Sequence, residues 1–378
     1  MTTSEIPANN TDAAQSKPTT LDFKGGGWVV VLALGLAAIV CVVQMIKIPD
    51  QLRWRDGQPP PPALSNSFDL HTATVPVGLI AVYRPKDAMQ VMVDPSLLDR
   101  EGMAEANKSN FTKYIVADDR VIGVTINGEA RAYPLRVLTY HEVANDTLGG
   151  VPILVSYCPI SGSAVVFDRR VGDKTLQFGM SGLIYNSNIL LYDIQDDEPL
   201  ESLWSQMTAT PIQGVAAGKP SLKPLPSRVM FWQDWQDAHP DTTVIAGDPR
   251  LMKQYRSDPF LTYPTHDGTS KFPVRPLMPR DDGHTKDVFL IVRADGEEAT
   301  FPSSQVEQNV DPGGTWRTTV GDTPVTIHFR KGRTLPHVLW AEADDPAKPL
   351  GSSQIAYRFV WYAHANAENV QASGQKPG

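Results

Sequence analysis

Short apolar runs separated by polar turns fill the chain from about residue 68 onward, and this pattern predicts β-strands rather than long helices. The clearest example is the apolar run Val121–Ile126, which is followed by the turn Asn127-Gly128 and the run Glu129–Tyr133. Asn-Gly favours the type I′ turn that joins two antiparallel strands. These residues therefore predict a β-hairpin.

Other local patterns complete the predicted fold. A second hairpin is predicted between Ala164–Arg169 and Thr175–Phe178. A short helix is predicted at Met230–His239, where Trp232 and Trp235 share one face. The predicted fold class is mainly β, an α+β domain with few short helices.

An uncharged apolar segment at residues 28–46 is about long enough to span a bilayer, at ~1.5 Å per residue. A cleaved signal peptide is the alternative, but no small-x-small cleavage site follows the segment. Lysines and arginines flank it on both sides, so the positive-inside rule does not choose an orientation. We expect a single-pass anchor in a bacterial inner membrane, with the main domain on the periplasmic side.

Composition shifts divide the rest of the chain. The expected parts are a disordered N-terminal tail at 1–27, the anchor at 28–46, a Pro-rich linker at 47–67, a first β-rich half at 68–250, a second β-rich half at 251–372 and a tail at 373–378. The net charge of −8 argues against nucleic acid as a partner. Two cysteines exclude a disulfide framework.

The two halves share an internal sequence similarity. Ile122–Pro134 can be aligned with Phe289–Pro302, since both read as strand, Gly-Glu turn, strand and aromatic-Pro. Farther along, Val151–Tyr157 aligns with Thr323–Phe329. The pattern predicts an internally duplicated β-sandwich or barrel-like domain, although hairpins of similar composition also look alike.

The halves differ around Cys158, which falls opposite Arg330 in this alignment. Residues 179–214 have no counterpart in the second half. An elaborated first copy favours a functional site in the first half.

Several motifs in a fixed order resemble one known family. They include Tyr157-Cys-Pro-Ile-Ser-Gly162, Tyr185-Asn-Ser-Asn188 and Ser202-Leu-Trp-Ser-Gln206. Over roughly residues 75–370 the chain resembles a bacterial and archaeal family catalogued as a domain of unknown function, number thirty-one seventy-nine. The resemblance implies an exported or membrane-anchored β-rich domain and no named activity. Some relatives have a second cysteine where this chain has Ser161, so a Cys-x-x-Cys pair is not expected here.

Cys158 is the main candidate for chemistry, and three interpretations stay open. It can be an inert buried cysteine, a nucleophile with His141 as base and Glu142 orienting it, or a soft-metal ligand. A copper site would use Cys158, His141 and Met180, because soft metals favour sulfur. Nothing in the spacing demands copper or zinc.

A polar and aromatic set suits a sugar or peptide ligand, through stacking and directed hydrogen bonds. The set is Tyr185, Asn186, Asn188, Trp204 and Gln206. These residues can equally be core and turn positions. The sequence thus leaves three functions open: binding of a small molecule, glycan or metal; a cysteine-dependent cell-envelope enzyme; and a structural or assembly protein.

Overall fold

The computed structural model describes residues 32–36, 66–108, 113–265, 272–279, 283–332 and 337–367. Of the anchor predicted at 28–46, only Leu32–Leu36 is described, as exposed helix. No helix in these ranges is long and apolar enough to cross a membrane. The tails predicted at 1–27 and 373–378, and most of the linker at 47–67, lie outside the described residues.

Strands dominate the described chain, as the sequence predicts. Those up to residue 250 are β1 (Ile80–Val82), β2 (Met92–Val93), β3 (Leu97–Leu98), β4 (Arg120–Ile126), β5 (Glu129–Pro134), β6 (Val143–Leu148), β7 (Val151–Cys158), β8 (Ser163–Asp168), β9 (Arg170–Val171), β10 (Lys174–Thr175), β11 (Phe178–Tyr185), β12 (Asn188–Asp193), β13 (Leu203–Ser205), β14 (Pro211–Gln213), β15 (Lys223–Leu225), β16 (Arg228–Phe231) and β17 (Thr243–Ile245). Those that follow are β18 (Val288–Ala294), β19 (Glu297–Pro302), β20 (Thr315–Val320), β21 (Thr323–Arg330), β22 (Val338–Ala343) and β23 (Ser352–Tyr357).

The helices are short. The α-helices from residue 66 on are α2 (Arg100–Ala106), α3 (Leu135–His141), α4 (Trp232–Ala238), α5 (Ser303–Asn309) and α6 (Arg358–Ala365). Short 3-10 helices lie at Leu70–Thr72, Val77–Leu79, Glu198–Leu200, Pro249–Leu251 and Gln254–Arg256. A mainly β fold with few short helices is confirmed.

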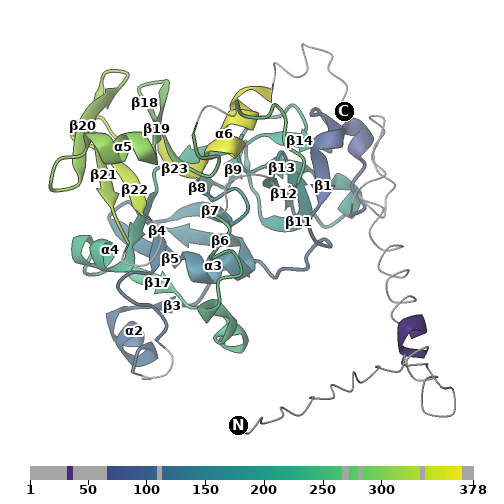
Figure 1. Cartoon of the computed structure of the whole chain (residues 1–378), viewed down its shortest axis with the longest axis horizontal. Coiled ribbons are helices and arrows are strands. Elements are labelled where there is room, and N and C mark those ends of the chain that lie inside the picture. Colours follow the sequence, from purple (N-terminus) through teal and green to yellow (C-terminus); the bar gives the residue numbers. More distant parts are fainter. Residues whose placement is uncertain are drawn as a thin grey trace, which may run out of the picture. The chain divides into compact units, whose positions relative to one another are not determined.

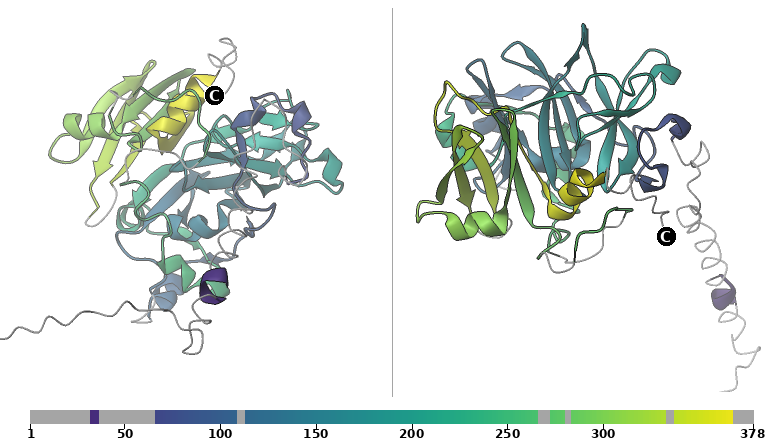
Figure 2. Two further views of the ribbon diagram at one scale, coloured as in Figure 1. Left: turned by 45° about the vertical axis from the view of Figure 1, so that its right-hand side comes forward. Right: turned by 90° about the horizontal axis from the view of Figure 1, so that it is seen from above.

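Three large sheets, a smaller curved one and the two-stranded sheet β9-β10 build the domain (Figure 1). The largest runs β19-β18-β23-β8-β7-β6-β2, with β15 also paired to β8. Two five-stranded sheets run β16-β4-β5-β17-β3 and β1-β11-β12-β13-β14. The strands β20, β21 and β22 form the smaller sheet. It lies away from the β11–β14 sheet, with β6 to β8 between them (Figures 1 and 2).

Two local predictions from the sequence, a hairpin and a helix, are confirmed. The Asn-Gly hairpin is confirmed as β4 and β5, with Asn127 at φ 50° and Gly128 at φ 84° as a type I′ turn requires. The helix predicted at Met230–His239 is confirmed as α4, whose Trp232 and Trp235 are both buried.

The second predicted hairpin is confirmed only next to its turn, where β9 pairs with β10 and the Leu176 amide donates to the Arg169 carbonyl at 2.9 Å; the longer pairing predicted for 164–168 is wrong. β8 pairs with β7, β15 and β23, and only the two-residue strands β9 and β10 form a hairpin at this point. The Arg169 side chain donates to the backbone carbonyls of Ile153 and Leu176 and so holds the chain where it leaves β8. Strand β11 then pairs with β12 and β1.

The same order of elements occurs in both halves. A hairpin, a seven-residue helix and a second hairpin follow one another as β4-β5-α3-β6-β7 and again as β18-β19-α5-β20-β21. Equivalent backbone bonds accompany them: the Trp232 amide donates to the Asp119 carbonyl at 2.7 Å, and the Arg358 amide donates to the Asp287 carbonyl at 2.8 Å. The two halves therefore share their local topology.

Strand β7 separates two apolar cores, because successive side chains of a strand point to opposite faces. Ile153, Val155 and Tyr157 belong to the large core that both halves share. Leu154 and Cys158 belong to a second core, which lies against the β11–β13 strands. Neighbouring residues of β7 thus reach different environments.

Candidate functional site

Cys158 ends strand β7, opposite Ser163 on β8, and is fully buried. Burial raises the pKa of its thiol to about 12, and the Glu142 carboxylate adds to the rise while Ser161 opposes it. A thiol is nucleophilic only as the thiolate. At ordinary pH the Cys158 side chain is therefore a protonated, unreactive thiol.

We expect the Cys158 thiol to resist alkylation in the folded protein. At pH 8, iodoacetamide should modify it only as fast as the protein unfolds, because the thiol is buried and its pKa is raised to about 12. Mass spectrometry of samples quenched over time, with and without urea, gives the rate. Rapid modification of the native protein would contradict the buried thiol.

Glu142 is the buried group electrostatically coupled to Cys158. It caps the C-terminal end of α3 in the left-handed conformation, with φ 56°, and its side chain is fully buried. Its backbone carbonyl accepts a hydrogen bond from the Tyr157 amide at 2.9 Å, which places it opposite the residue before Cys158. Neither carboxyl oxygen has a hydrogen-bond partner among the described residues. Burial raises the pKa of this carboxyl to about 8, so it is mostly protonated at pH 7.

His141 is held by other partners. Its Nδ1 lies 2.6 Å from the Gln90 carbonyl oxygen and its Nε2 lies 2.7 Å from the Tyr255 hydroxyl. A neutral ring satisfies both contacts by donating from Nδ1 and accepting at Nε2. Burial lowers the pKa of His141 and favours this neutral form. Both ring nitrogens are thus occupied, and neither has Cys158 as its partner.

Of the three copper ligands predicted from sequence, only Cys158 and Met180 lie in the same core. Across the described ranges, no three His, Cys, Asp or Glu side chains are grouped closely enough to hold a metal ion. A copper or zinc site at Cys158, His141 and Met180 stays a prediction.

Two members of the predicted ligand set, Asn188 and Gln206, join a buried hydrogen-bond network beside Cys158. The Asn188 amide lies 3.0 Å from both Ser161 Oγ and Ser163 Oγ, and 2.6 Å from Gln206 Oε1. The Gln206 amide in turn donates to Ser156 Oγ at 3.0 Å. These bonds join β7 and β8 to the β11–β13 strands across an otherwise apolar layer.

The other three members hold structure together in different ways. Trp204 is buried edge-on to Phe178 at 5.7 Å. Asn186 exchanges two hydrogen bonds with the backbone of Arg275. Tyr185 packs edge-on against the ring of His364 at 5.3 Å. None of the five predicted ligand residues lines the main pocket.

That pocket, with a cavity volume of about 260 Å³, lies between α3, the turn after β7 and residues 255–264. Its walls combine charged and aromatic side chains. Among them are Asp119, Arg120, Arg136, Tyr140, Tyr157, Tyr255, Asp258, Phe260 and Tyr357. Tyr157 and Pro159 therefore reach the pocket from either side of Cys158 in the chain, while Cys158 itself lies in the core on the other face of β7.

Arg120 lines both the main pocket and a smaller cavity of about 30 Å³. Burial raises the pKa of the Tyr157 and Tyr357 hydroxyls, and the nearby Arg120 guanidinium partly offsets this rise. In the described part of the chain, carboxylates pair with Arg131 and Arg136, but none pairs with Arg120. A cation without a carboxylate partner thus borders both cavities.

Arg136 forms part of the pocket wall from α3. It pairs with Asp119 at 3.0 Å, and its Nη1 donates to the Tyr114 carbonyl at 3.0 Å. Its Nε is buried and has no hydrogen-bond partner among the described residues. One donor of this guanidinium is therefore still available.

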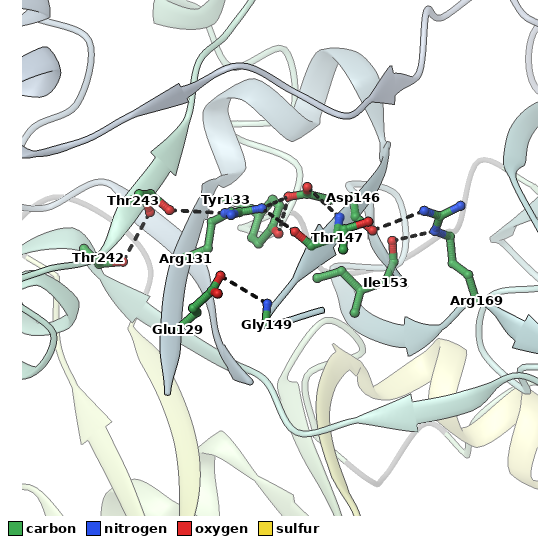
Figure 3. A network of polar contacts seen from close by, with 10 residues as sticks. All are labelled: Glu129, Arg131, Tyr133, Asp146, Thr147, Gly149, Ile153, Arg169, Thr242 and Thr243. Atoms are coloured by element: carbon green, nitrogen blue, oxygen red, sulfur yellow. Dashed lines mark hydrogen bonds and ion pairs between the residues drawn. The ribbon is translucent and has the colours of Figure 1, made fainter. Parts of the chain in front are cut away.

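A buried polar network fixes the strands that lead into the site (Figure 3). Arg131 Nη1 donates to Asp146 Oδ2 at 2.7 Å, and the Tyr133 hydroxyl donates to the same oxygen at 2.7 Å. Arg169 donates to the Asp146 carbonyl at 3.2 Å. The network ties β5 to β6, on either side of α3.

The sequence alone did not single out the pocket residues. Arg120, Tyr357 and the 255–264 segment are far apart in the chain and come together only in the folded domain. One signal was present, because Tyr157 and Pro159 flank Cys158 in the motif that carries the family resemblance.

Comparisons with known proteins place the chain in a family. No curated protein and no solved structure matches it. The family model described as "Protein of unknown function (DUF3179)" matches residues 95–370, which include α3, the turn after β7 and the pocket. The match covers well over half of the 378 residues. The chain therefore belongs to the DUF3179 family.

Proposed function

We propose that this protein is a binding domain for a small planar molecule with polar groups, held in the 260 Å³ pocket. The carrying observation is the pocket wall, which combines tyrosine and phenylalanine rings with guanidinium and carboxylate groups. Aromatic walls bind planar rings by stacking, and a few placed polar groups fix their orientation. The volume lies slightly below the usual range for drug-sized ligands, which favours a small one.

The buried thiol favours binding over cysteine chemistry. Cys158 lies in the core on the far side of β7 from the pocket, with its pKa raised to about 12. His141 is bonded to Gln90 and Tyr255. The alternative of a cysteine-dependent cell-envelope enzyme would need a thiolate and a free base, and these contacts oppose both.

The scaffold of this proposal is an internally duplicated one. Its support is the repeated order of elements and a second pair of equivalent backbone bonds. The Tyr157 amide donates to the Glu142 carbonyl, and the Phe329 amide donates to the Gly314 carbonyl, both at 2.9 Å. We further propose that residues 28–46 anchor the domain on the periplasmic side of a bacterial inner membrane, on the strength of their apolar run.

Blocking the pocket should abolish binding of a planar probe. Ser257 is exposed at the pocket edge, so Ser257→Trp should fill the entrance at little cost to folding. Benzamide should raise the melting temperature of the wild-type protein and leave that of Ser257→Trp unchanged. The stabilisation grows with ligand concentration, to about 2.7 kcal/mol at 100 times Kd.

The matched control is Thr319→Trp, which adds the same side chain at an exposed position on β20. It should respond to benzamide as the wild type does. An equal benzamide shift in Ser257→Trp, or no shift in the wild type up to the solubility limit, would contradict the proposed pocket.

A further inference from the structure

A second, small cavity shares the lining residues Arg120, Pro264 and Tyr357 with the main pocket, and we call it the inner end. Arg120 is its one charged lining residue in the described chain, and no aspartate or glutamate lines it. We infer that this inner end is a carboxylate-binding site, so that the small molecule of the proposed function, on which this inference rests, is a carboxylic acid. Arg120 would bind the carboxylate through its two-pronged guanidinium.

His337 supplies a second donor in the same cavity. Its Nε2 is buried and has no hydrogen-bond partner among the described residues. Burial lowers the pKa of His337, and the Arg120 guanidinium acts in the same direction. The ring is therefore neutral, and a neutral imidazole can present an N–H at Nε2. A bound carboxylate would satisfy this donor, whose lack of a partner otherwise costs free energy.

The hydroxyls of Tyr157 and Tyr357 complete the surroundings of Arg120. Both tyrosines line the main pocket, and Tyr357 also lines the small cavity. Their pKa values are raised by burial, so both hydroxyls stay protonated and can donate. Donors therefore surround the inner end, and an acceptor-only group suits it best.

The size of the inner cavity distinguishes between anions. Its volume of about 30 Å³ is room for about two water-sized groups. The two oxygens of a carboxylate fit such a space, whereas a phosphate carries more oxygens than it can hold. The geometry thus favours a carboxylate.

None of the carboxylates of the described chain lines the small cavity, although Asp258 is near enough to contribute to the raised pKa of the Tyr157 and Tyr357 hydroxyls. Asp119 is paired with Arg136, and Asp258 is exposed at the pocket edge. Asp287 and Glu307 oppose the lowering of the His337 pKa, and Asp287 accepts hydrogen bonds from the hydroxyls of Ser303 and Ser304. An exposed carboxylate at the entrance further favours a ligand whose outer end is neutral or cationic.

The two donors also mark where the halves differ. Arg120 begins β4 and Val288 begins the equivalent strand β18. Gly162 directly precedes β8 and His337 directly precedes the equivalent strand β22. All four residues line the small cavity, so it lies where equivalent positions of the two halves meet. The first half supplies Arg120 and the second half supplies His337. The equivalent residues in the opposite halves, Val288 and Gly162, have no polar side chain.

Calorimetric titration with benzoate and benzamide tests the inference on the whole protein. The two probes have the same shape and differ in charge. Benzoate should bind the wild type at least tenfold more tightly than benzamide. Arg120→Gln should lower the affinity for benzoate at least tenfold more than it lowers the affinity for benzamide. Arg317→Gln, the same charge change at an exposed position on β20, should behave as the wild type.

Further variants protect the test against a folding defect. Arg120→Lys keeps the charge and loses the two-pronged geometry, so it should show an intermediate loss of benzoate affinity. His337→Leu should lower the affinity for benzoate several-fold more than it lowers the affinity for benzamide. Benzoate binding no tighter than benzamide, or inorganic phosphate binding more tightly than benzoate, would overturn the carboxylate site while the planar-ligand pocket stands. Failure of both aromatic probes would overturn the proposed function itself.

Discussion

Asp146→Ala should lower the free energy of unfolding by about 3–5 kcal/mol, the usual cost of removing one partner from a buried ion pair. The Arg131 and Asp146 side chains are 8% and 6% exposed and meet at 2.7 Å. The same oxygen of Asp146 accepts from the Tyr133 hydroxyl at 2.7 Å. Alanine would leave a buried guanidinium without its counter-charge and a buried hydroxyl without its acceptor (Figure 3). Urea unfolding followed by tryptophan fluorescence gives the change.

Two further variants separate the ion pair from a general loss of charge. Asp173→Ala removes a carboxylate from the exposed turn between β9 and β10 and should change stability by less than about 0.5 kcal/mol. The double variant Arg131→Met with Asp146→Leu removes both charges and should recover much of the loss, since apolar replacements of buried pairs are often neutral. A loss below about 1 kcal/mol in Asp146→Ala would mean that water reaches the pair.

Glu142→Gln should remove a large pH dependence from the stability of the protein. The pKa of Glu142 is about 8 when folded, against 4.5 as its ordinary value. Below pH 4.5 the carboxyl is protonated in both states. As the pH rises from 4.5 towards 8, the unfolded chain releases a proton that the folded protein keeps, so the free energy of unfolding falls. The whole fall is on the order of 5 kcal/mol and is complete above about pH 8.

The readout is the slope of stability against pH, measured by urea unfolding from pH 5 to pH 9. Glutamine cannot ionise, so the variant should lose this slope and become more stable than the wild type above pH 8. Any cost of burying the amide is the same at every pH and leaves the slope unaffected. Glu297→Gln, at an exposed position on β19, serves as the matched control and should keep the wild-type slope. Equal slopes in the wild type and Glu142→Gln would show that Glu142 reaches solvent.

Local signals in the sequence predicted local structure well. Asn127-Gly128 fixes its hairpin because both residues adopt positive φ, and the Trp232 and Trp235 spacing places one face of α4 in the core. No comparable local pattern in the sequence predicts which distant strands pair. β8 pairs with β15 and with β23, and neither partner adjoins it in the chain. The hairpin predicted between 164–169 and 175–178 therefore forms only next to its turn, because β8 pairs with β15 and β23 instead.

At the candidate site too, local features were predictable from the sequence and contacts between distant segments were not. The sequence directed attention to Cys158 and to the turn that follows it, and Tyr157 and Pro159 beside it line the pocket. It did not indicate that Glu142, rather than His141, would be coupled to the thiol. That choice depends on the left-handed turn at Glu142, which ends α3 before β6 begins. Arg120 and His337 could not be associated before the two halves were packed together.

The pairing of Ile355 on β23 with Ala164 on β8 has a consequence for how the protein is made. The two residues are about 190 positions apart, so at 5–20 residues per second the ribosome needs ~10–40 s to deliver the partner of β8. During this interval the Ala164 end of β8 has an open edge, and open edges recruit other strands. Nascent chains of this protein should therefore depend on a chaperone that shields that edge until synthesis is complete.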